Sequence, residues 1–379
     1  MPEAGYILTH RVYPVDEVGA TLITALIQGR DLSECYYWIF ELYHSGLDVF
    51  LLLERIYLDF YFSENPLAIG EYIIKKQLAT QDQPDQLEKD PAKEIASIVR
   101  NLFRAKASSS VFIVRQLFLA DLPPNKIYRR PFPAWLAQFP KLYHILLLAI
   151  HSQHWTNICY YLKRCFEHPA LLDGPLSAYD KLEVLLKIYF QRIRGWTEPW
   201  PALLNTFDAH YLLALLSHVF RQEATRSTAA APGPAKMLFL SPKPEDIAAL
   251  KILDSRRQPY QINLHIRDFK LARYAIAADH LLLLAELDWH WLFYAAHAPI
   301  WFKRLEAHNG TIDYSFKQVI FLDDDDKERF YEAYDFDFEE QPPAVKAQSQ
   351  PALTTTRWLD MVFPGSDISC LPSNWLFQL

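Results

Sequence analysis

Four groups of residues in this chain carry side chains that could do chemistry, and the first is a group of imidazoles and thiols. Five zinc-competent side chains fall within eighteen residues: His151, His154, Cys159, Cys165 and His168. Four of them would have to converge on one tetrahedral point to hold zinc, and their spacing matches no common zinc pattern. Both cysteines also occupy apolar positions of an expected amphipathic helix. We therefore interpret the group as core cysteines with surface or capping histidines, and we predict no metal site.

The second group is a run of four carboxylates, Asp323, Asp324, Asp325 and Asp326, that opens an acidic segment. Residues 323–340 contain ten acidic and two basic side chains, while the whole chain has a net charge of only −7, so the remainder is nearly neutral. Calcium and magnesium sites need oxygen ligands spaced around a turn, whereas a contiguous run points mostly into water. The run indicates a helix capped by Asp326 with a solvated acidic face, or a docking surface for a basic partner.

The third group is a basic stretch. Residues 100–130 contain seven basic side chains and one acid, with aromatic residues between them. Positive charge interleaved with aromatic rings is typical of a groove for single-stranded nucleic acid. The candidate contact residues are Arg100, Arg104, Arg115, Arg129 and Arg130. Because the body of the chain is nearly neutral, a strong phosphate-driven affinity is not favoured, and nucleic-acid binding is only the alternative function.

Catalytic and nucleotide-binding motifs are missing from the sequence. It contains no glycine-rich phosphate loop, no GxGxxG, no GxSxG, no HExxH and no CxxC. His290 and His297, in the aromatic-rich stretch 288–304, could share a helix face as an acid–base or metal pair. A buried aromatic cluster with satisfied histidines is the simpler interpretation. We therefore predict a protein that is not an enzyme and that needs no cofactor.

The elements that would position these groups are mostly helices. Apolar side chains recur at helical spacing from residue 32 to residue 43 and again from residue 49 to residue 61. Asp31 precedes the first set and Glu34 follows three residues later, which is the arrangement of a capping box. Gly29 and Gly46 suit the ends of the helices before and after. Residues 22–62 therefore predict three consecutive helices that pack side by side.

The composition agrees with a helical fold. Glycine is scarce, at 10 residues, while apolar residues make up 51% and aromatic residues 15% of the chain. The fold class that we predict is mainly α, a helical-hairpin or repeat-like bundle with at most a small β-hairpin near 312–322. Cys-Tyr-Tyr follows ten residues after an alanine in both ALIQGRDLSECYY (25–37) and AIHSQHWTNICYY (149–161). This similarity leaves a helical repeat and an irregular bundle equally supported.

The predicted domain organisation has four parts. They are a helical, repeat-like domain (1–222), a linker or long loop (223–236), a smaller mainly helical region that ends in the acidic segment (237–340), and a flexible tail with an apolar end (341–379). No apolar run reaches the ~18 residues of a membrane span, and the N-terminus lacks the features of a signal peptide. Four scattered cysteines predict a reducing compartment.

The tail contains the residues that we predict to bind a partner. They are Trp358, Met361, Phe363, Trp375 and Phe377. Aromatic side chains behind a flexible spacer are a common way to occupy a groove on another protein. An alternative of equal weight is that residues 357–379 dock on their own domain.

Five segments of the chain resemble an uncharacterised protein family of large nucleocytoplasmic DNA viruses, the giant viruses. They are GRDLSECYYWIFELYHSGLDVF, LLLERIYLDFYFSENP, RQPYQINLHIRDFKLAR, HWLFYAAHAPIWFKR and FLDDDDKERFYEAYDFDFEEQ, and the resemblance covers most of residues 20–341. These segments carry no catalytic motif, so the resemblance implies no active site. It implies a viral protein in the host cytoplasm, at the viral factory, or in the virion. With the acidic segment and the tail, it predicts a non-enzymatic protein–protein interaction or virion assembly protein whose partner is not identified.

Overall fold

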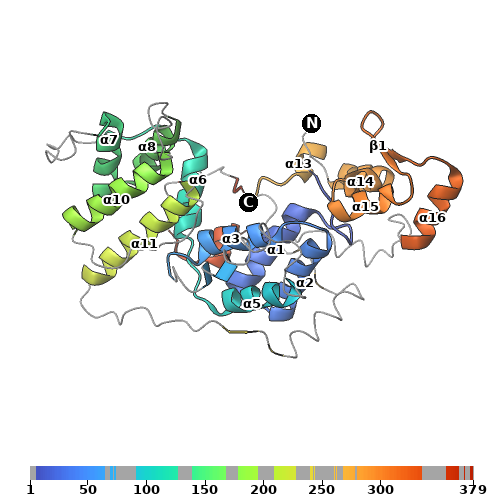
Figure 1. The fold of residues 1–379 in the computed structure, drawn as a ribbon, viewed down its shortest axis with the longest axis horizontal. Coiled ribbons are helices and arrows are strands. Elements are labelled where there is room, and N and C mark those ends of the chain that lie inside the picture. The colour runs from blue at the N-terminus through green and yellow to red at the C-terminus, as the bar shows by residue number, and fades with distance from the viewer. Residues whose placement is uncertain are drawn as a thin grey trace.

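The computed structural model describes most of the chain, and the fold is presented for that part. The described residues are 6–64, 69–70, 72–73, 91–126, 139–167, 178–194, 209–227, 240–241, 243, 260, 262, 268–277, 280–334, 356–366, 371 and 376–378. Within them the structure contains fourteen helices and one two-stranded antiparallel sheet, which confirms the predicted mainly α fold. The described helices form an elongated molecule whose chain order does not follow its long axis, because the first helices lie in the middle (Figure 1). None of the described helices is both long and apolar enough to cross a membrane.

The middle of the molecule begins with the three helices that the sequence predicts: α1 (Val15–Gln28), α2 (Leu32–His44) and α3 (Val49–Phe60). Gly29 ends α1 with a φ of 59°, a left-handed conformation that glycine adopts without strain. The Asp31 carboxylate caps α2 by accepting a hydrogen bond from the Ser33 backbone N–H (3.1 Å). The Glu34 carboxylate instead accepts the Trp38 indole N–H (3.3 Å), so only half of the predicted capping box forms.

Two further helices complete the middle of the molecule. They are α5 (Pro91–Arg104), which packs against α1, α2 and α3, and α6 (Ser110–Ala120), which packs against α3. The chain leaves helical structure between them at residues 105–109. The Ser108 backbone N–H donates to the Phe60 carbonyl there (2.7 Å), which fixes the turn to the end of α3.

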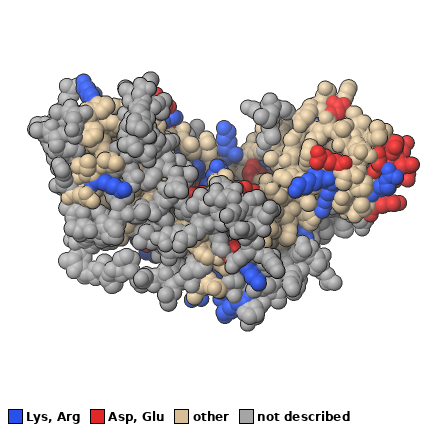
Figure 2. Space-filling model, in the orientation of Figure 1, with Lys and Arg blue, Asp and Glu red and all other residues tan. Residues whose placement is uncertain are grey.

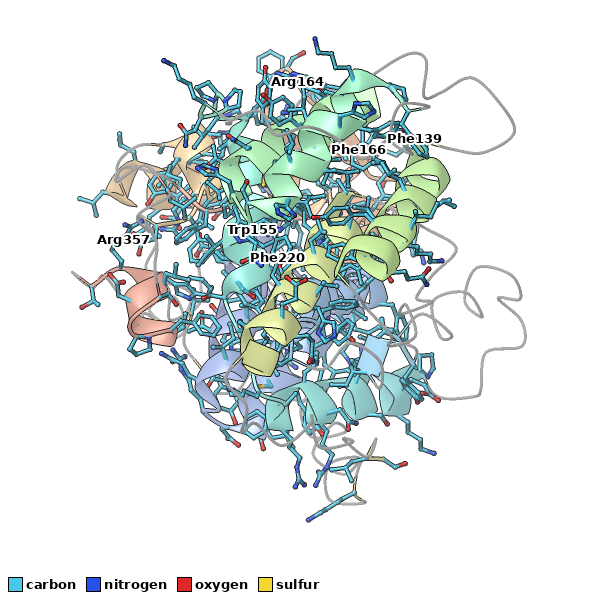
Figure 3. All side chains as sticks on the ribbon, turned by 90° about the vertical axis from the view of Figure 1, so that its left-hand side faces the viewer. Phe139, Trp155, Arg164, Phe166, Phe220 and Arg357 are labelled. Carbon is cyan, nitrogen blue, oxygen red and sulfur yellow. The ribbon has the colours of Figure 1, made fainter. Side chains whose placement is uncertain are left out.

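One end of the molecule consists of four helices: α7 (Lys141–His151), α8 (Trp155–Glu167), α10 (Ala178–Arg194) and α11 (Ala209–Ser227). Helix α7 pairs with α8, which lies on α6, and α11 contacts α3 and α6. Trp155 of α8 packs on Phe220 of α11 with ring centroids 5.1 Å apart (Figure 3). Cys35 of α2 and Cys159 of α8 are both buried, but Tyr36 and Tyr37 are buried while Tyr160 and Tyr161 are only partly buried, so the helical repeat stays a prediction.

The other end has its own buried cluster, which we call the second core. It is built from α13 (Arg273–Ile276), α14 (His280–Ala295), α15 (Pro299–Glu306), strands β1 (Thr311–Asp313) and β2 (Gln318–Ile320), and α16 (Asp324–Tyr334). The two strands pair antiparallel with Ile312 opposite Val319, which confirms the predicted hairpin. We call the larger cluster, which runs from α1 through α11, the central core.

The N-terminal segment enters the second core rather than the central one. Tyr6, Leu8 and Val12 are buried there, and the Trp301 indole N–H donates to the Thr9 carbonyl (2.9 Å). The start of the chain therefore packs on residues that follow the predicted linker. Residues 223–227 of the predicted linker belong to α11, and residues 228–236 lie outside the described part of the chain. The predicted domain boundaries therefore stay a prediction.

A buried ion pair joins α1 of the central core to α13. The Arg273 guanidinium donates to both carboxylate oxygens of Glu17, with 2.7 Å between Nη2 and Oε2. Next to it, the Asp16 carboxylate accepts the Ala272 backbone N–H (2.8 Å). Burial raises the pKa of Glu17 to about 7, even though the Arg273 charge acts to lower it. The ion pair therefore does not fully offset the cost of burying the carboxylate.

The tail returns to the central core. Helix α18 (Trp358–Val362) begins it, and Trp358 is fully buried. The Trp358 indole N–H donates to the Thr24 hydroxyl of α1 (2.8 Å), and its backbone N–H donates to the Asp268 carboxylate. Its ring lies against the rings of Phe60 and Phe112, with centroids 6.1 and 5.6 Å away. The tail is thus a structural part of the core that α1, α3 and α6 build.

Phe377 fixes a second point of the tail. Its side chain is fully buried, and its backbone forms a parallel bridge with Phe269. The Phe377 N–H donates to the Asp268 carbonyl (2.7 Å), and the Lys270 N–H donates to the Phe377 carbonyl (2.9 Å). The described parts of the tail therefore dock on their own chain, which is the alternative that the sequence left open.

We expect the substitution Trp358→Ala to lower the free energy of unfolding by about 3–5 kcal/mol, because it opens a cavity and leaves Thr24 without its indole partner. Denaturant unfolding followed by circular dichroism measures this loss. The matched control is Trp289→Ala, at a tryptophan that is 80% exposed, where a change within about 0.5 kcal/mol is expected. Equal losses in both variants would contradict the position assigned to the tail.

Candidate functional site

The acidic run begins α16, but its cap differs from the prediction. The Asp323 carboxylate accepts the backbone N–H of Asp326 (2.8 Å), so Asp323 caps a helix that starts at Asp324. The sequence placed the cap at Asp326, which is wrong by one helical turn. Carboxylates in the first turn are favourable because they lie near the positive end of the helix dipole.

Asp326 is buried, unlike its three neighbours. Its carboxylate accepts hydrogen bonds from the Asn309 side-chain amide (3.0 Å) and from the Arg329 guanidinium. The hydrogen bond from Asn309 has the largest effect on the pKa of Asp326, and both hydrogen bonds lower it. Asp326 therefore fastens α16 to the turn after α15 and does not belong to a docking surface. The predicted acidic surface is reduced to Asp323, Asp324 and Asp325, which are exposed.

Large apolar side chains are exposed beside the acidic residues. Of the thirteen exposed large apolar side chains in the described part of the chain, eight lie between residues 281 and 322, and we call these eight the apolar surface. They are Leu281, Leu282, Trp289, Phe302, Tyr314, Phe316, Ile320 and Leu322. Figure 2 shows this end of the molecule as a largely uncharged area, with acidic side chains gathered at its outer edge and some basic side chains among and beside them.

The hairpin and α14 hold this surface in place. The His290 Nδ1 atom lies 2.8 Å from the Lys317 carbonyl oxygen, so Trp289 and Phe316, which precede these residues, come from segments that touch. Trp289 is 80% and Phe316 71% exposed. Side chains alternate along a strand, and Val319 packs on the second core, so Ile320 faces outward. The hairpin and α14 therefore both present apolar side chains to solvent.

His290 and His297 contact different groups. His290 contacts the Lys317 carbonyl on the hairpin, whereas the Nδ1 atom of His297, in the turn after α14, lies 2.8 Å from the Phe293 carbonyl of α14. The aromatic residues between them, including Trp291 and Tyr294, are mostly buried. The interpretation as an aromatic cluster with satisfied histidines accounts for this geometry.

The tail residues do not form a free binding segment. Trp358 and Phe377 are fully buried, and Met361 and Phe363 pack partly buried against the same core. Trp375 lies outside the described residues. The prediction of partner binding is therefore corrected for Trp358 and Phe377, because neither can reach a partner without opening the central core. The sequence could not distinguish the two possibilities, because a polar stretch followed by apolar residues is expected both for a tail that binds a partner and for a tail that docks on its own domain.

The described bases of the basic stretch are dispersed. Arg100 is buried in α5, and Arg115 is bound to Asp59, with 2.9 Å between Nε and Oδ1. Arg104 is exposed at the end of α5. The other two candidates, Arg129 and Arg130, lie outside the described residues. The three candidates that the structure places do not share one exposed face, which is the arrangement that a phosphate-binding groove requires.

The imidazole and thiol group is also dispersed over separate environments. His151 and His154 contact side chains elsewhere in the chain, at 3.0 and 3.2 Å. Cys159 and Cys165 are buried in α8, and His168 lies outside the described residues. Across the described ranges, no three His, Cys, Asp or Glu side chains come together in a way that could hold a metal ion.

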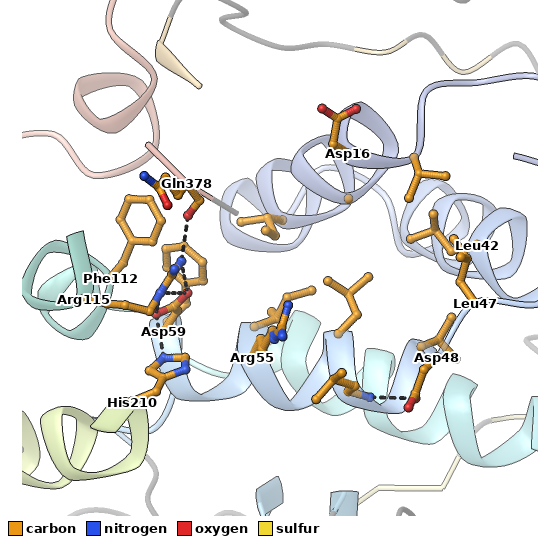
Figure 4. A pocket seen from close by; sticks show the side chains of 18 of the residues that line it. Asp16, Leu42, Leu47, Asp48, Arg55, Asp59, Phe112, Arg115, His210 and Gln378 are labelled. Carbon is orange, nitrogen blue, oxygen red and sulfur yellow. Dashed lines mark hydrogen bonds and ion pairs between the residues drawn. The ribbon is translucent and has the colours of Figure 1, made fainter. Parts of the chain in front are cut away.

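The structure also contains a site that the sequence did not reveal. A cleft of about 660 Å³ lies between α1 and α3, with α6 at one end (Figure 4). Its walls are mainly apolar and include Ile23, Leu52, Ile56, Phe112 and Leu119. This volume falls in the range of small-molecule pockets.

A buried network of charges closes one end of the cleft. The Asp59 carboxylate of α3 binds Arg115 of α6 and lies 2.8 Å from the Nε2 atom of His210 on α11. Arg115 also donates to the Gln378 carbonyl of the tail (3.0 Å). Burial acts to raise the pKa of Asp59, but the charges of Arg115 and His210 outweigh it and lower the pKa. The network therefore holds three helices and the tail together.

Arg55 of α3 projects into the middle of the cleft (Figure 4). It is exposed and makes no hydrogen bond or ion pair with any residue that the structure describes. The carboxylates of the lining are all engaged. Asp48 caps α3 by accepting the Leu51 N–H (3.0 Å), Asp16 accepts backbone N–H groups, and Asp59 belongs to the network.

Comparison of the chain with protein-family models, with curated proteins and with solved structures finds no match. The similarity to a giant-virus family therefore stays a prediction from the sequence.

We expect Asp59→Asn to reduce the free energy of unfolding at pH 7 by about 3 kcal/mol, because it leaves the Arg115 cation buried without its anion. The pKa of Asp59 is lowered by folding, so the ionised carboxylate stabilises the protein above its unfolded-state pKa, and this contribution is lost as the pH falls. The difference between protein and variant should therefore shrink between about pH 5 and pH 3. Urea unfolding at several pH values measures it.

The control for this experiment is Asp48→Asn, on the same helix and in the same cleft. Asparagine caps a helix as well as aspartate does, so a change below about 0.5 kcal/mol is expected. A loss in Asp59→Asn that does not vary with pH would contradict the role of its charge.

Proposed function

We propose that this chain is a non-enzymatic interaction protein that binds a protein partner through its apolar surface. The observation that carries the proposal is the concentration of eight exposed large apolar side chains on α14, α15 and the hairpin. Burying apolar area yields roughly 25 cal/mol per Å², and single exposed apolar residues are ordinary, whereas a cluster marks an interaction site. Trp289 and Phe316 are the best anchors, since aromatic side chains dominate binding energy at interfaces.

The chemistry of the partner follows from the acidic residues beside this surface. Leu322 is directly followed by Asp323, Asp324 and Asp325, and Glu328 of α16 is exposed as well. Such charges steer a basic surface toward the site and set its orientation, while the apolar contacts provide affinity. The partner that fits is a protein with apolar contact residues flanked by lysine or arginine.

Two sequence observations support an interaction role. The chain contains no catalytic motif, and the resemblance to the giant-virus family implies no activity. That resemblance extends the proposal to virion assembly, with another viral protein as the partner in the host cytoplasm or in the virion. This extension rests on the resemblance alone. Nucleic-acid binding through the basic stretch has no structural observation in its favour.

The test is affinity purification of the tagged full chain from expressing or infected cells, with quantitative mass spectrometry and with or without nuclease. We expect the double variant Trp289→Ala, Phe316→Ala to lower the recovery of the partner at least about tenfold, since an interface anchor is worth about 2 kcal/mol or more. Asp324→Asn with Asp325→Asn should lower the recovery less and weaken its dependence on salt.

The matched control is Val184→Ala on α10, an apolar side chain that is 49% exposed and lies outside the apolar surface. Thermal unfolding should be unchanged in all these variants, because every substituted side chain is exposed. The proposal is contradicted if the double variant recovers as much of the partner as the control variant does. Partners that disappear after nuclease treatment would support nucleic-acid binding in its place.

A further inference from the structure

A glycine in the wall of the cleft has no structural explanation in the folded chain. Gly19 lies inside helix α1, is buried, and has no left-handed backbone. A glycine in a helix interior costs about 1 kcal/mol relative to alanine. A methyl group at its Cβ position would meet nothing within 4 Å, so close packing does not require a glycine here. The space in front of Gly19 is the cleft itself.

The cleft combines this space with two kinds of lining. Its walls include Ile23, Leu52 and Phe112. An apolar ligand that covers these side chains removes apolar surface from water, which favours binding. Arg55 is the one charged group of the lining without a partner among the described residues, because the acids and Arg115 are engaged. A guanidinium offers a planar set of N–H donors that fits a carboxylate in bidentate fashion.

We propose that the cleft between α1 and α3 binds an anionic amphiphile, a carboxylate on a long apolar chain. The carboxylate pairs with Arg55, and the apolar chain lies along α1 in the space that Gly19 leaves open. A volume of about 660 Å³ suits such a small molecule. The cleft is formed by the central helices, so this binding is separate from the partner binding proposed for the apolar surface.

The test uses the purified full chain and 11-(dansylamino)undecanoic acid, a fluorescent fatty-acid probe. Laurate should displace the probe, and dodecanol, its neutral counterpart, should displace it at least tenfold less well. Arg55→Ala should weaken the binding of laurate at least tenfold and leave that of dodecanol unchanged. Arg55→Lys should lie between the two, because lysine keeps the charge and loses the bidentate geometry.

A second variant tests the position of the apolar chain. Gly19→Leu places a side chain in the open space and should abolish displaceable probe binding, while thermal unfolding shows that the variant is folded. Trp289→Ala is the control for probe bound on the apolar surface and should leave displaceable binding intact. The proposal is overturned if the probe shows no displaceable binding, if Gly19→Leu binds it normally, or if Arg55→Ala weakens laurate and dodecanol equally.

Discussion

The central core depends on the burial of one indole. Trp358 comes from the tail, yet it touches α1 through the Thr24 hydroxyl, α3 through Phe60 and α6 through Phe112. Helices α1 and α3 also form the walls of the cleft, and α6 closes it. The spacing of these helices, and with it the width of the cleft, is therefore set by a side chain that lies 334 residues after its partner Thr24 on α1. Phe377 adds a second fixed point beside it.

The two cores are bound to each other by contacts of different kinds. The Glu17–Arg273 ion pair is buried and polar, whereas the N-terminal segment carries Tyr6 and Leu8 into the apolar interior of the second core. Together these contacts place the apolar surface on a rigid base, which limits the ordering cost of binding a partner.

The local parts of this fold could be predicted from the sequence, and the distant contacts could not. The three helices of residues 22–62 and the hairpin follow from periodicity and from caps such as Asp31, all within a few residues. Arg115 read as one base of a surface stretch, because nothing near it in the sequence reveals its partner Asp59. One signal for the cleft was present, since Arg55 and Asp59 interrupt an apolar helix four residues apart. Gly19 carried no signal at all, because its empty surroundings exist only in three dimensions.

The return of the tail also has a consequence for synthesis of the chain. Thr24 and Trp358 are separated by 334 residues, which at about 5–20 residues per second corresponds to roughly 17–67 s on the ribosome. Until Trp358 is synthesised, the space that its indole occupies between the surrounding helices is empty. Their apolar faces are accessible to other nascent chains and to chaperones. The central core of this protein is therefore completed late in translation, although its first helices are among the earliest residues made.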